Sequence, residues 1–117
     1  MNTFICYDKC GTCKKAKKWL DAHGIAYEVR PIKEENPSQD ELAEWIKKSG
    51  RPVRKFFNTS GQLYRSMQLK DRLKEMSEEE MIGLLASDGM LVKRPVFLSG
   101  ENVLVGFKEE EWEAAIL

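Results

Sequence analysis

The first third of the chain alternates between strand-like and helix-like patterns of apolar residues. A β-branched and aromatic run over 3–7 predicts a strand, and apolar or small residues recur at helical spacing over 11–23. A second extended run follows over 25–32, where Pro31 biases Arg30 toward extended geometry. The chain therefore opens β-α-β, and a right-handed crossover would place the two strands parallel in one sheet.

Helical patterns dominate the middle of the chain. Ser38 and Ser77 are each followed three residues later by a glutamate, and these capping boxes predict two helices that end at Gly50 and Gly89. Over 51–76, apolar residues are scattered among polar ones, which predicts only short helical turns. Together, these helices and turns form a helical insertion after the β-α-β unit.

The last quarter of the chain returns to strands. Extended runs over 95–98 and 103–105, joined by a tight turn over 99–102, predict a β-hairpin. The segment 108–116 predicts a closing helix, because three glutamates lie near its positive N-terminal end. The element order is β-α-β, helical insertion, β-β-α. At this length we expect a single domain over 1–117 with a core that needs no disulfides.

Composition and charge narrow the function classes. The chain has 19 basic and 19 acidic residues and a pI near 6.6. It therefore lacks the excess of positive charge that is typical of a protein that binds nucleic acid on its own. No apolar stretch approaches the roughly 18 residues of a membrane span, and no secretory signal is visible. Three cysteines, two of them in a C-x-x-C, do not fit a secreted disulfide framework. We expect a cytoplasmic protein with reduced thiols, no direct nucleic-acid partner and no membrane association.

The candidate chemistry lies in Cys10-Gly11-Thr12-Cys13, between the first predicted strand and the helix that follows it. The sulfur of Cys10 would face unpaired backbone N–H groups and the positive end of the helix dipole, which favour a nucleophilic thiolate. Cys13, one turn further on, would attack a mixed disulfide at Cys10 and release the partner. The motif predicts a pair that cycles between dithiol and disulfide, with protein or small-molecule disulfides as substrates.

Other interpretations of the reactive residues stay open. The two cysteines of the motif can instead be small core residues, or ligands of a zinc ion, for which only Cys6 and His23 add donors. We predict no metal. Cys6 alternates with Ile5 and Tyr7, which favours a packed apolar residue over a third redox thiol, and His23 is expected only to end its helix. The lysine run over 14–18 is either a solvated face or an attractor of an anionic substrate such as glutathione.

Four segments of the chain are specific in combination. They read FICYDKCGTCKKAKKWL at 4–20, ENPSQDEL at 35–42, VRKFFNTSGQLYR at 53–65 and KRPV at 93–96. Together they resemble the ArsC family, especially its Spx and arsenate-reductase-like branch, essentially from end to end. The resemblance implies a thioredoxin-like α/β fold, with a mixed four-stranded sheet and a helical subdomain inserted at approximately 36–90.

The resemblance also implies positions for the site. Cys10 matches the family's catalytic cysteine, and Arg94-Pro95 matches its cis-proline element, which lies opposite the cysteine loop. In arsenate reductases the arginine at this position helps to hold the oxyanion; a surface salt bridge is the alternative role for Arg94. With Gly11 and Thr12 of the loop, Arg94 and Pro95 make up the expected substrate-binding residues.

Departures from the sequence pattern of arsenate reductases indicate which of the family's functions this chain has. Glutathione-dependent arsenate reductases carry serine where this chain has Cys13, and three arginines around the oxyanion, whereas Asn58 and Gly106 stand at two of those positions. Losing two guanidiniums should weaken oxyanion binding by several kcal/mol, at roughly 1.5 to 3 kcal/mol each. Spx-type regulators of RNA polymerase do have a dithiol here. Gly50 matches their glycine near the polymerase contact, but the enzyme branch has it too.

The sequence therefore predicts an arsenate-reductase-like thiol-disulfide oxidoreductase that uses Cys10 and Cys13. It implies no bound cofactor, but it does imply a thiol donor such as glutathione, glutaredoxin or thioredoxin. The alternative is an Spx-like, redox-sensing transcriptional regulator that contacts RNA polymerase. Glutathione-dependent arsenate reduction ranks below both.

Overall fold

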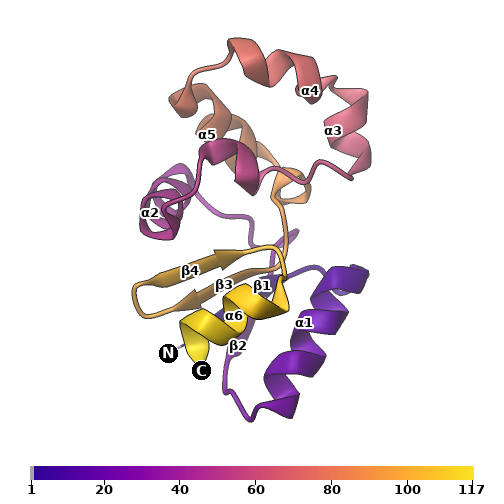
Figure 1. Ribbon diagram of the computed structural model, residues 1–117. Coiled ribbons are helices and arrows are strands. Elements are labelled where there is room, and N and C mark those ends of the chain that lie inside the picture. The colour runs from indigo at the N-terminus through magenta and orange to yellow at the C-terminus, as the bar shows by residue number, and fades with distance from the viewer. Residues whose placement is uncertain (1) are drawn as a thin grey trace.

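The computed structural model describes residues 2–117 (Figure 1). The strands are β1 (Thr3–Cys6), β2 (Glu28–Pro31), β3 (Val96–Ser99) and β4 (Asn102–Val105). The α-helices are α1 (Gly11–Ala22), α2 (Gln39–Ser49), α3 (Gln62–Ser66), α4 (Leu69–Arg72), α5 (Glu78–Ser87) and α6 (Glu109–Ile116). Three short 3₁₀ helices are η1 (Val53–Phe56), η2 (Leu73–Glu75) and η3 (Gly89–Leu91). The predicted order of strands and helices is confirmed, and the stretch after α2 does consist of short helical turns.

The four strands form one sheet in the order β2-β1-β3-β4. β1 pairs with β2 in parallel, as the β-α-β pattern predicted, while β3 pairs antiparallel with both β1 and β4. Phe4, in the middle of β1, stands opposite Val29 on one side and Phe97 on the other. This mixed sheet confirms the thioredoxin-like fold.

The sheet separates two apolar cores. Alternate residues of a strand point to opposite faces, so Phe4 and Phe97 face one side while Ile5 and Val96 face the other. The first face packs against α1 and α6 through Trp19, Trp112 and their apolar neighbours. The second face packs against the helices between β2 and β3. Figure 1 shows this arrangement, with α1 and α6 on one side of the sheet and the insertion on the other.

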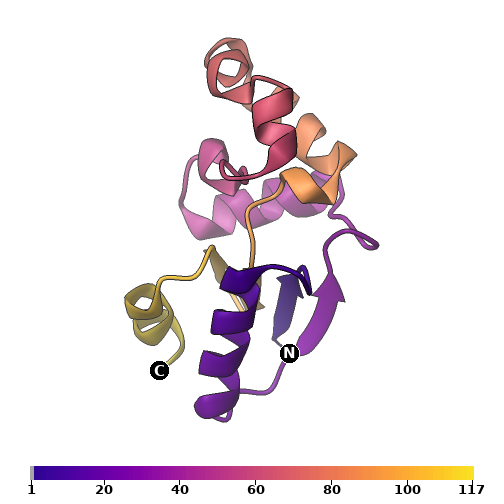
Figure 2. The ribbon, with the colours of Figure 1, turned by 90° about the vertical axis from the view of Figure 1, so that its right-hand side faces the viewer.

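The helical insertion is joined to the sheet by two segments, one after β2 and one before β3 (Figure 2). Ion pairs also bridge the two parts. Arg30 of β2 holds Glu41 of α2 through two hydrogen bonds of 2.6 and 2.9 Å. Arg51, which follows α2, binds Glu111 of α6. The position of the insertion over the sheet is therefore fixed by charge pairs as well as by apolar packing.

The predicted helix boundaries hold where they rest on local signals. Both capping boxes form: the hydroxyls of Ser38 and Ser77 each accept a hydrogen bond from the backbone N–H three residues later. Gly50 ends α2 in the left-handed conformation, with φ of 68°. The expected role of Gly89 is wrong, because α5 ends at Ser87 and Gly89 opens η3.

Gly89 is required for a different reason. A methyl carbon added to Gly89 would lie 2.0 Å from the carbonyl oxygen of Ile32, and neither backbone can move aside without disturbing the core. The glycine therefore lets the end of the insertion pack directly on the chain after β2. Within residues 2–117, every helix is too short or too polar to cross a lipid bilayer.

Candidate active site

Cys10 occupies the residue before the first turn of α1. Its backbone is extended, its N–H donates to the carbonyl of Tyr7 at 3.0 Å, and its own carbonyl accepts the first helical hydrogen bond, from Lys14 at 3.1 Å. The side chain is half-buried and lines a pocket. The thiol does not cap a backbone N–H of α1, so the direct contact expected from the sequence is not formed, although the sulfur does stand at the helix N-terminus.

Cys13 lies one turn into α1 and is buried, with 3% of its surface exposed. The backbone N–H of Tyr7 donates to its Sγ at 3.5 Å, and Cys6 and Cys10 pack against the same apolar core. The neighbouring Cys6 thiol, together with burial, raises the pKa of Cys13 above its ordinary value. The setting of Cys13 therefore favours the thiol over the thiolate.

Cys6, the remaining cysteine of the chain, is the last residue of β1. It has the same parity on β1 as Phe4, so its side chain faces α1 and packs on the same apolar core. Its hydrogen bond with Cys13 lowers the pKa of Cys6, and the charge of Lys17 acts in the same direction. The expectation of a packed residue agrees with its contacts in this apolar core. Phe4 and Cys6 are two residues apart on β1, and this spacing was the sequence signal that both face α1.

The pocket beside Cys10 has a volume of about 440 Å³ and takes its walls from both parts of the molecule. Cys10 and Thr12 come from the start of α1, and Arg94 from the segment before β3. The remaining walls are residues 58–61 and 105–108, with Arg51, Lys55, Lys93 and Glu111. Five of these side chains are cationic (Arg51, Lys55, Lys93, Arg94 and Lys108), and one is a carboxylate, Glu111. The pocket is therefore strongly basic.

Most of this positive charge is uncompensated. Glu111 pairs with Arg51 and lies 3.8 Å from Lys108. Among residues 2–117, no carboxylate lies within 4.0 Å of Lys55, Lys93 or Arg94. The surface salt bridge considered for Arg94 is thus not formed. An acidic group that enters the pocket meets three free cations.

Arg94 is held beside the cysteine loop. Its guanidinium lies over the ring of Tyr7, 5.1 Å from the ring centroid, and its Nη1 donates to the carbonyl of Met90 at 3.4 Å. Its Nε is buried and has no hydrogen-bond partner among residues 2–117. The cation–π contact with Tyr7 holds the guanidinium in the pocket that Cys10 also lines, without neutralising its charge.

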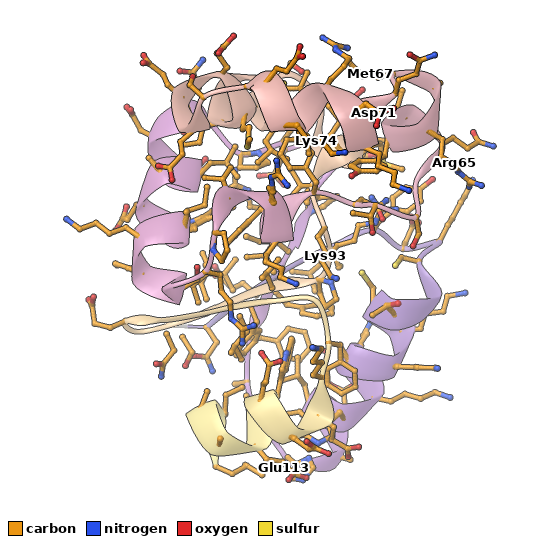
Figure 3. The ribbon with its side chains drawn as sticks, turned by 45° about the horizontal axis from the view of Figure 1, so that its top comes forward. Arg65, Met67, Asp71, Lys74, Lys93 and Glu113 are labelled. Atoms are coloured by element: carbon orange, nitrogen blue, oxygen red, sulfur yellow. The ribbon has the colours of Figure 1, made fainter. Side chains whose placement is uncertain are left out.

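Lys93 lies over Gly106, one of the two positions where the enzyme pattern has arginine. Gly106 has a left-handed backbone, with φ of 72°, and the aliphatic part of Lys93 packs against its Cα. Figure 3 shows Lys93 between the insertion and the sheet. Asn58, at the other arginine position, also lines the pocket, together with Lys55. Sequence reasoning missed both lysines, because their approach to Cys10 depends on the folding of distant segments.

The remaining predicted substrate residues, Gly11 and Pro95, do not line the pocket. The Arg94-Pro95 peptide bond is cis, as the resemblance implied, and the carbonyl of buried Pro95 accepts a hydrogen bond of 2.8 Å from the N–H of Gly106. Gly11 is the first residue of α1 and is exposed outside the pocket. Of the predicted residues, Cys10, Thr12 and Arg94 therefore line the pocket.

The residues considered for zinc do not assemble. Within residues 2–117, no three His, Cys, Asp or Glu side chains come together in a group that could hold a metal ion. His23 ends α1, where its Nδ1 lies 2.8 Å from the carbonyl oxygen of Trp19 and its ring packs on the indole, 4.3 Å between centroids.

Known proteins share this architecture and much of the sequence. Uncharacterized protein YusI of Bacillus subtilis is 55% identical over 111 residues, which cover 95% of this chain and 94% of that protein. The crystal structure of an ArsC family related protein from Bacteroides fragilis matches with a TM-score of 0.95 at 52% identity, over 97% of this chain and 95% of that one. Regulatory protein MgsR of Bacillus subtilis is 28% identical, over 93% of this chain and 85% of its own length.

The family assignment rests on nearly the whole length of the chain. The model of the ArsC family matches residues 6–115, a range that includes all three cysteines, the insertion and the cis-proline segment. The sequence resemblance, the thioredoxin-like sheet and the high similarity to the Bacteroides fragilis structure agree. This chain belongs to the ArsC family.

Proposed function

We propose that this protein is a thiol-disulfide oxidoreductase in which Cys10 is the nucleophile and Cys13 the resolving thiol. The observation that carries the proposal is the position of the two sulfurs. Cys10 is half-buried at the wall of the pocket, whereas Cys13, one turn further along α1, is buried and does not line it. A substrate in the pocket can therefore reach Cys10 but not Cys13.

The reaction proceeds in two exchanges. The thiolate of Cys10 attacks one sulfur of a substrate disulfide, the substrate S–S bond breaks, and one substrate half leaves as a thiolate. Cys13 then loses its proton and attacks the Cys10 sulfur, which releases the second half as a thiolate and forms the Cys10–Cys13 disulfide. Two electrons pass from the dithiol to the substrate. An external thiol donor returns them: glutathione, glutaredoxin or thioredoxin for a protein disulfide, but a donor other than glutathione when the substrate is glutathione disulfide, because glutathione would only regenerate it. No bound cofactor takes part.

The pocket supports a preference for disulfides that carry carboxylates. Lys55, Lys93 and Arg94 lack acidic partners within residues 2–117, and they surround the approach to Cys10. Such a concentration of one charge attracts an anionic molecule and orients it over the reacting sulfur. Glutathione disulfide, with its several carboxylates, is the small molecule that we propose as substrate, and acidic peptide segments are the protein counterpart.

A regulator is the second candidate function, and the similarity to MgsR favours it. In that case the Cys10–Cys13 pair would act as a redox switch that changes the affinity for RNA polymerase, as the resemblance to Spx implies. Catalysis and switching use the same sulfurs and differ in turnover.

Turnover of glutathione disulfide, with electrons supplied by NADPH, thioredoxin reductase and thioredoxin, tests the proposed enzyme; a blank without this protein gives the direct reduction to be subtracted. We expect turnover by the wild-type protein, none by Cys10→Ser, and a stable mixed disulfide with Cys13→Ser. A parallel capture from cell lysate uses Cys13→Ser under oxidising and reducing conditions. Recovery of diverse disulfide-linked proteins supports the enzyme. Retention of RNA polymerase by the wild-type chain, without turnover, would replace it with the regulator.

A further inference from the structure

A second pocket, on the helical insertion, adjoins the pocket beside Cys10. It has a volume of about 360 Å³. Lys55, Thr59 and Lys93 line both pockets, so the two cavities share a wall. A molecule that extends from the first pocket across these three residues therefore enters the second one.

The second pocket has basic residues of its own. Besides the two shared lysines, Arg54 of η1 and Lys70 of α4 line it, and both of these residues are exposed. No carboxylate belongs to its lining, and within residues 2–117 no acidic group lies within 4.0 Å of Arg54 or Lys70. The uncompensated positive charge near Cys10 therefore continues into the second pocket.

The second pocket also presents an apolar surface. Pro52, Phe57, Tyr64 and Leu73 contribute to its lining. Pro52 is exposed and Tyr64 is half-buried, so part of this surface contacts solvent. Covering apolar surface favours binding, and the surrounding cations attract negative charge. The pocket therefore suits a ligand that combines carboxylates with an aromatic or large aliphatic group.

This combination favours a polypeptide over glutathione disulfide as the occupant of the second pocket. Glutathione carries carboxylates but no large apolar side chain, so it would leave the apolar surface uncovered. An extended polypeptide advances about 3.3 to 3.6 Å per residue, so the residues that flank a cysteine in the first pocket can cross into the second within a few positions. Nucleic acids fit less well, because they lack the disulfides on which Cys10 would act.

We propose that the second pocket binds the polypeptide segment that flanks the reactive cysteine of a protein disulfide substrate, and that this segment combines acidic residues with an aromatic or large aliphatic one. The inference rests on the proposed function, since it concerns the substrate that Cys10 attacks. The chemistry is unchanged: the Cys10 thiolate bonds to one substrate sulfur, and the other sulfur of that disulfide leaves as a thiolate. The second pocket holds the flanking segment during this exchange.

Single-turnover reactions with matched peptides test the inference. Each peptide carries one cysteine as a disulfide with 2-thiopyridine. The acidic peptide has two glutamates and a phenylalanine on each side of the cysteine; a neutral version has glutamine for glutamate, and a third version has serine for phenylalanine. Attack by the reduced protein releases thiopyridone, whose absorbance gives the second-order rate constant. Cys10→Ser is the blank.

Two double variants with the same change in net charge are compared. At low ionic strength we expect Arg54→Met/Lys70→Met to lower the rate constant for the acidic peptide about fivefold or more, and to change those for the neutral peptide and glutathione disulfide less than about twofold. Lys33→Met/Lys47→Met, at exposed positions outside both pockets, should leave all three unchanged. Tyr64→Ser should slow the acidic peptide with phenylalanine more than the version with serine.

Equal slowing by the two double variants would reduce the effect to net charge and overturn the inference. An unchanged rate for the acidic peptide with Arg54→Met/Lys70→Met would also overturn it; in both cases, continued turnover of glutathione disulfide through Cys10 leaves the proposed function standing. Absence of a Cys10-dependent reaction with every disulfide would instead remove the proposed function. A single-stranded oligonucleotide that inhibits the acidic-peptide reaction at lower concentration than the unlinked peptide would assign the second pocket to nucleic acid.

Discussion

The side chain of Lys93 lies directly against the backbone of Gly106, so that a methyl carbon on Gly106 would come within 2.7 Å of Lys93 Cε. The enzyme pattern places an arginine at Gly106, and here a lysine from a neighbouring segment covers the position instead. The position of Lys93 therefore depends on the absence of a side chain at Gly106.

Removal of the Lys93 charge should slow the reaction of Cys10 with anionic disulfides only. Lys93→Met keeps the aliphatic stem over Gly106, and we expect a fall of about three- to tenfold in the rate with a dianionic aromatic disulfide at low ionic strength. The rate with neutral dithiodipyridine serves as the reference and should not change. Lys47→Met, at an exposed position of α2, is the control variant. Equal slowing with both reagents would show that Lys93 acts on the sulfur rather than on the substrate.

Alanine substitutions at two glycines of the insertion should have opposite effects on stability. At Gly89 the new methyl group would meet the backbone of Ile32, so we expect Gly89→Ala to lose about 3 kcal/mol or more. At Gly83, inside α5, the nearest atom is 3.7 Å away, and alanine should add about 0.5 to 1 kcal/mol by favouring the helix. Urea unfolding measures both. A similar loss at each site would contradict the proposed close packing at Gly89.

The Arg30–Glu41 pair should make stability depend on pH in the acid range. The hydrogen bonds from Arg30 lower the pKa of Glu41 from 4.5 to about 2, so its stabilisation is complete above pH 4.5 and is lost as the pH falls toward 2. Glu41 is 38% exposed, and after solvent screening we expect Glu41→Gln to cost about 1 to 2 kcal/mol at pH 7.

The second capping box provides the control for that measurement. Glutamine can keep the capping-box geometry at either position, but Glu80 has no arginine partner. Glu80→Gln should therefore show a smaller loss at pH 7. Unfolding curves collected between pH 2 and 7 should converge for wild type and Glu41→Gln at the acid end. Parallel curves across the range would assign the loss to packing instead of charge.

We expect negligible glutathione-dependent arsenate reduction. Beside Cys10 the pocket offers one unpaired guanidinium, Arg94, because Arg51 is bound to Glu111 and Asn58 and Gly106 replace arginines. The lysines supply charge but not the bidentate fork that suits a tetrahedral oxyanion. Turnover at micromolar arsenate with glutathione and glutaredoxin is the measurement, with Cys10→Ser as the blank. Robust turnover that depends on Cys10 would show that lysines suffice.

The elements that were predicted correctly are those whose causes are local in sequence. The two capping boxes, the alternation along β1 and the helical spacing in α1 each act within a few residues, and each forms as expected. The role of Gly89 was missed because it depends on Ile32, more than fifty residues earlier in the chain. No local sequence pattern predicts a contact between such distant residues.

The residues of the candidate site were likewise predictable only where their position has a local cause or follows from the family resemblance. The position of Cys10 before α1 follows from the order of strand and helix, and Arg94 followed from the family resemblance. The packing of Cys6 against the core under α1 depends on how the helix lies across the sheet, although the position of Cys6 on β1, two residues after Phe4, already pointed it toward that side. Lys55 and Lys93 reach the pocket only because the insertion folds back over it.

The two sides of the pocket come from separate stretches of the chain. The reactive sulfur lies at the start of α1, whereas residues 51–61, 93–94 and 105–111 supply the rest of the wall. The side chains that would select a substrate therefore belong to other segments than the one that carries the thiols. A substitution at Asn58 or Thr59 would change which molecules the pocket admits and leave Cys10 and Cys13 in place.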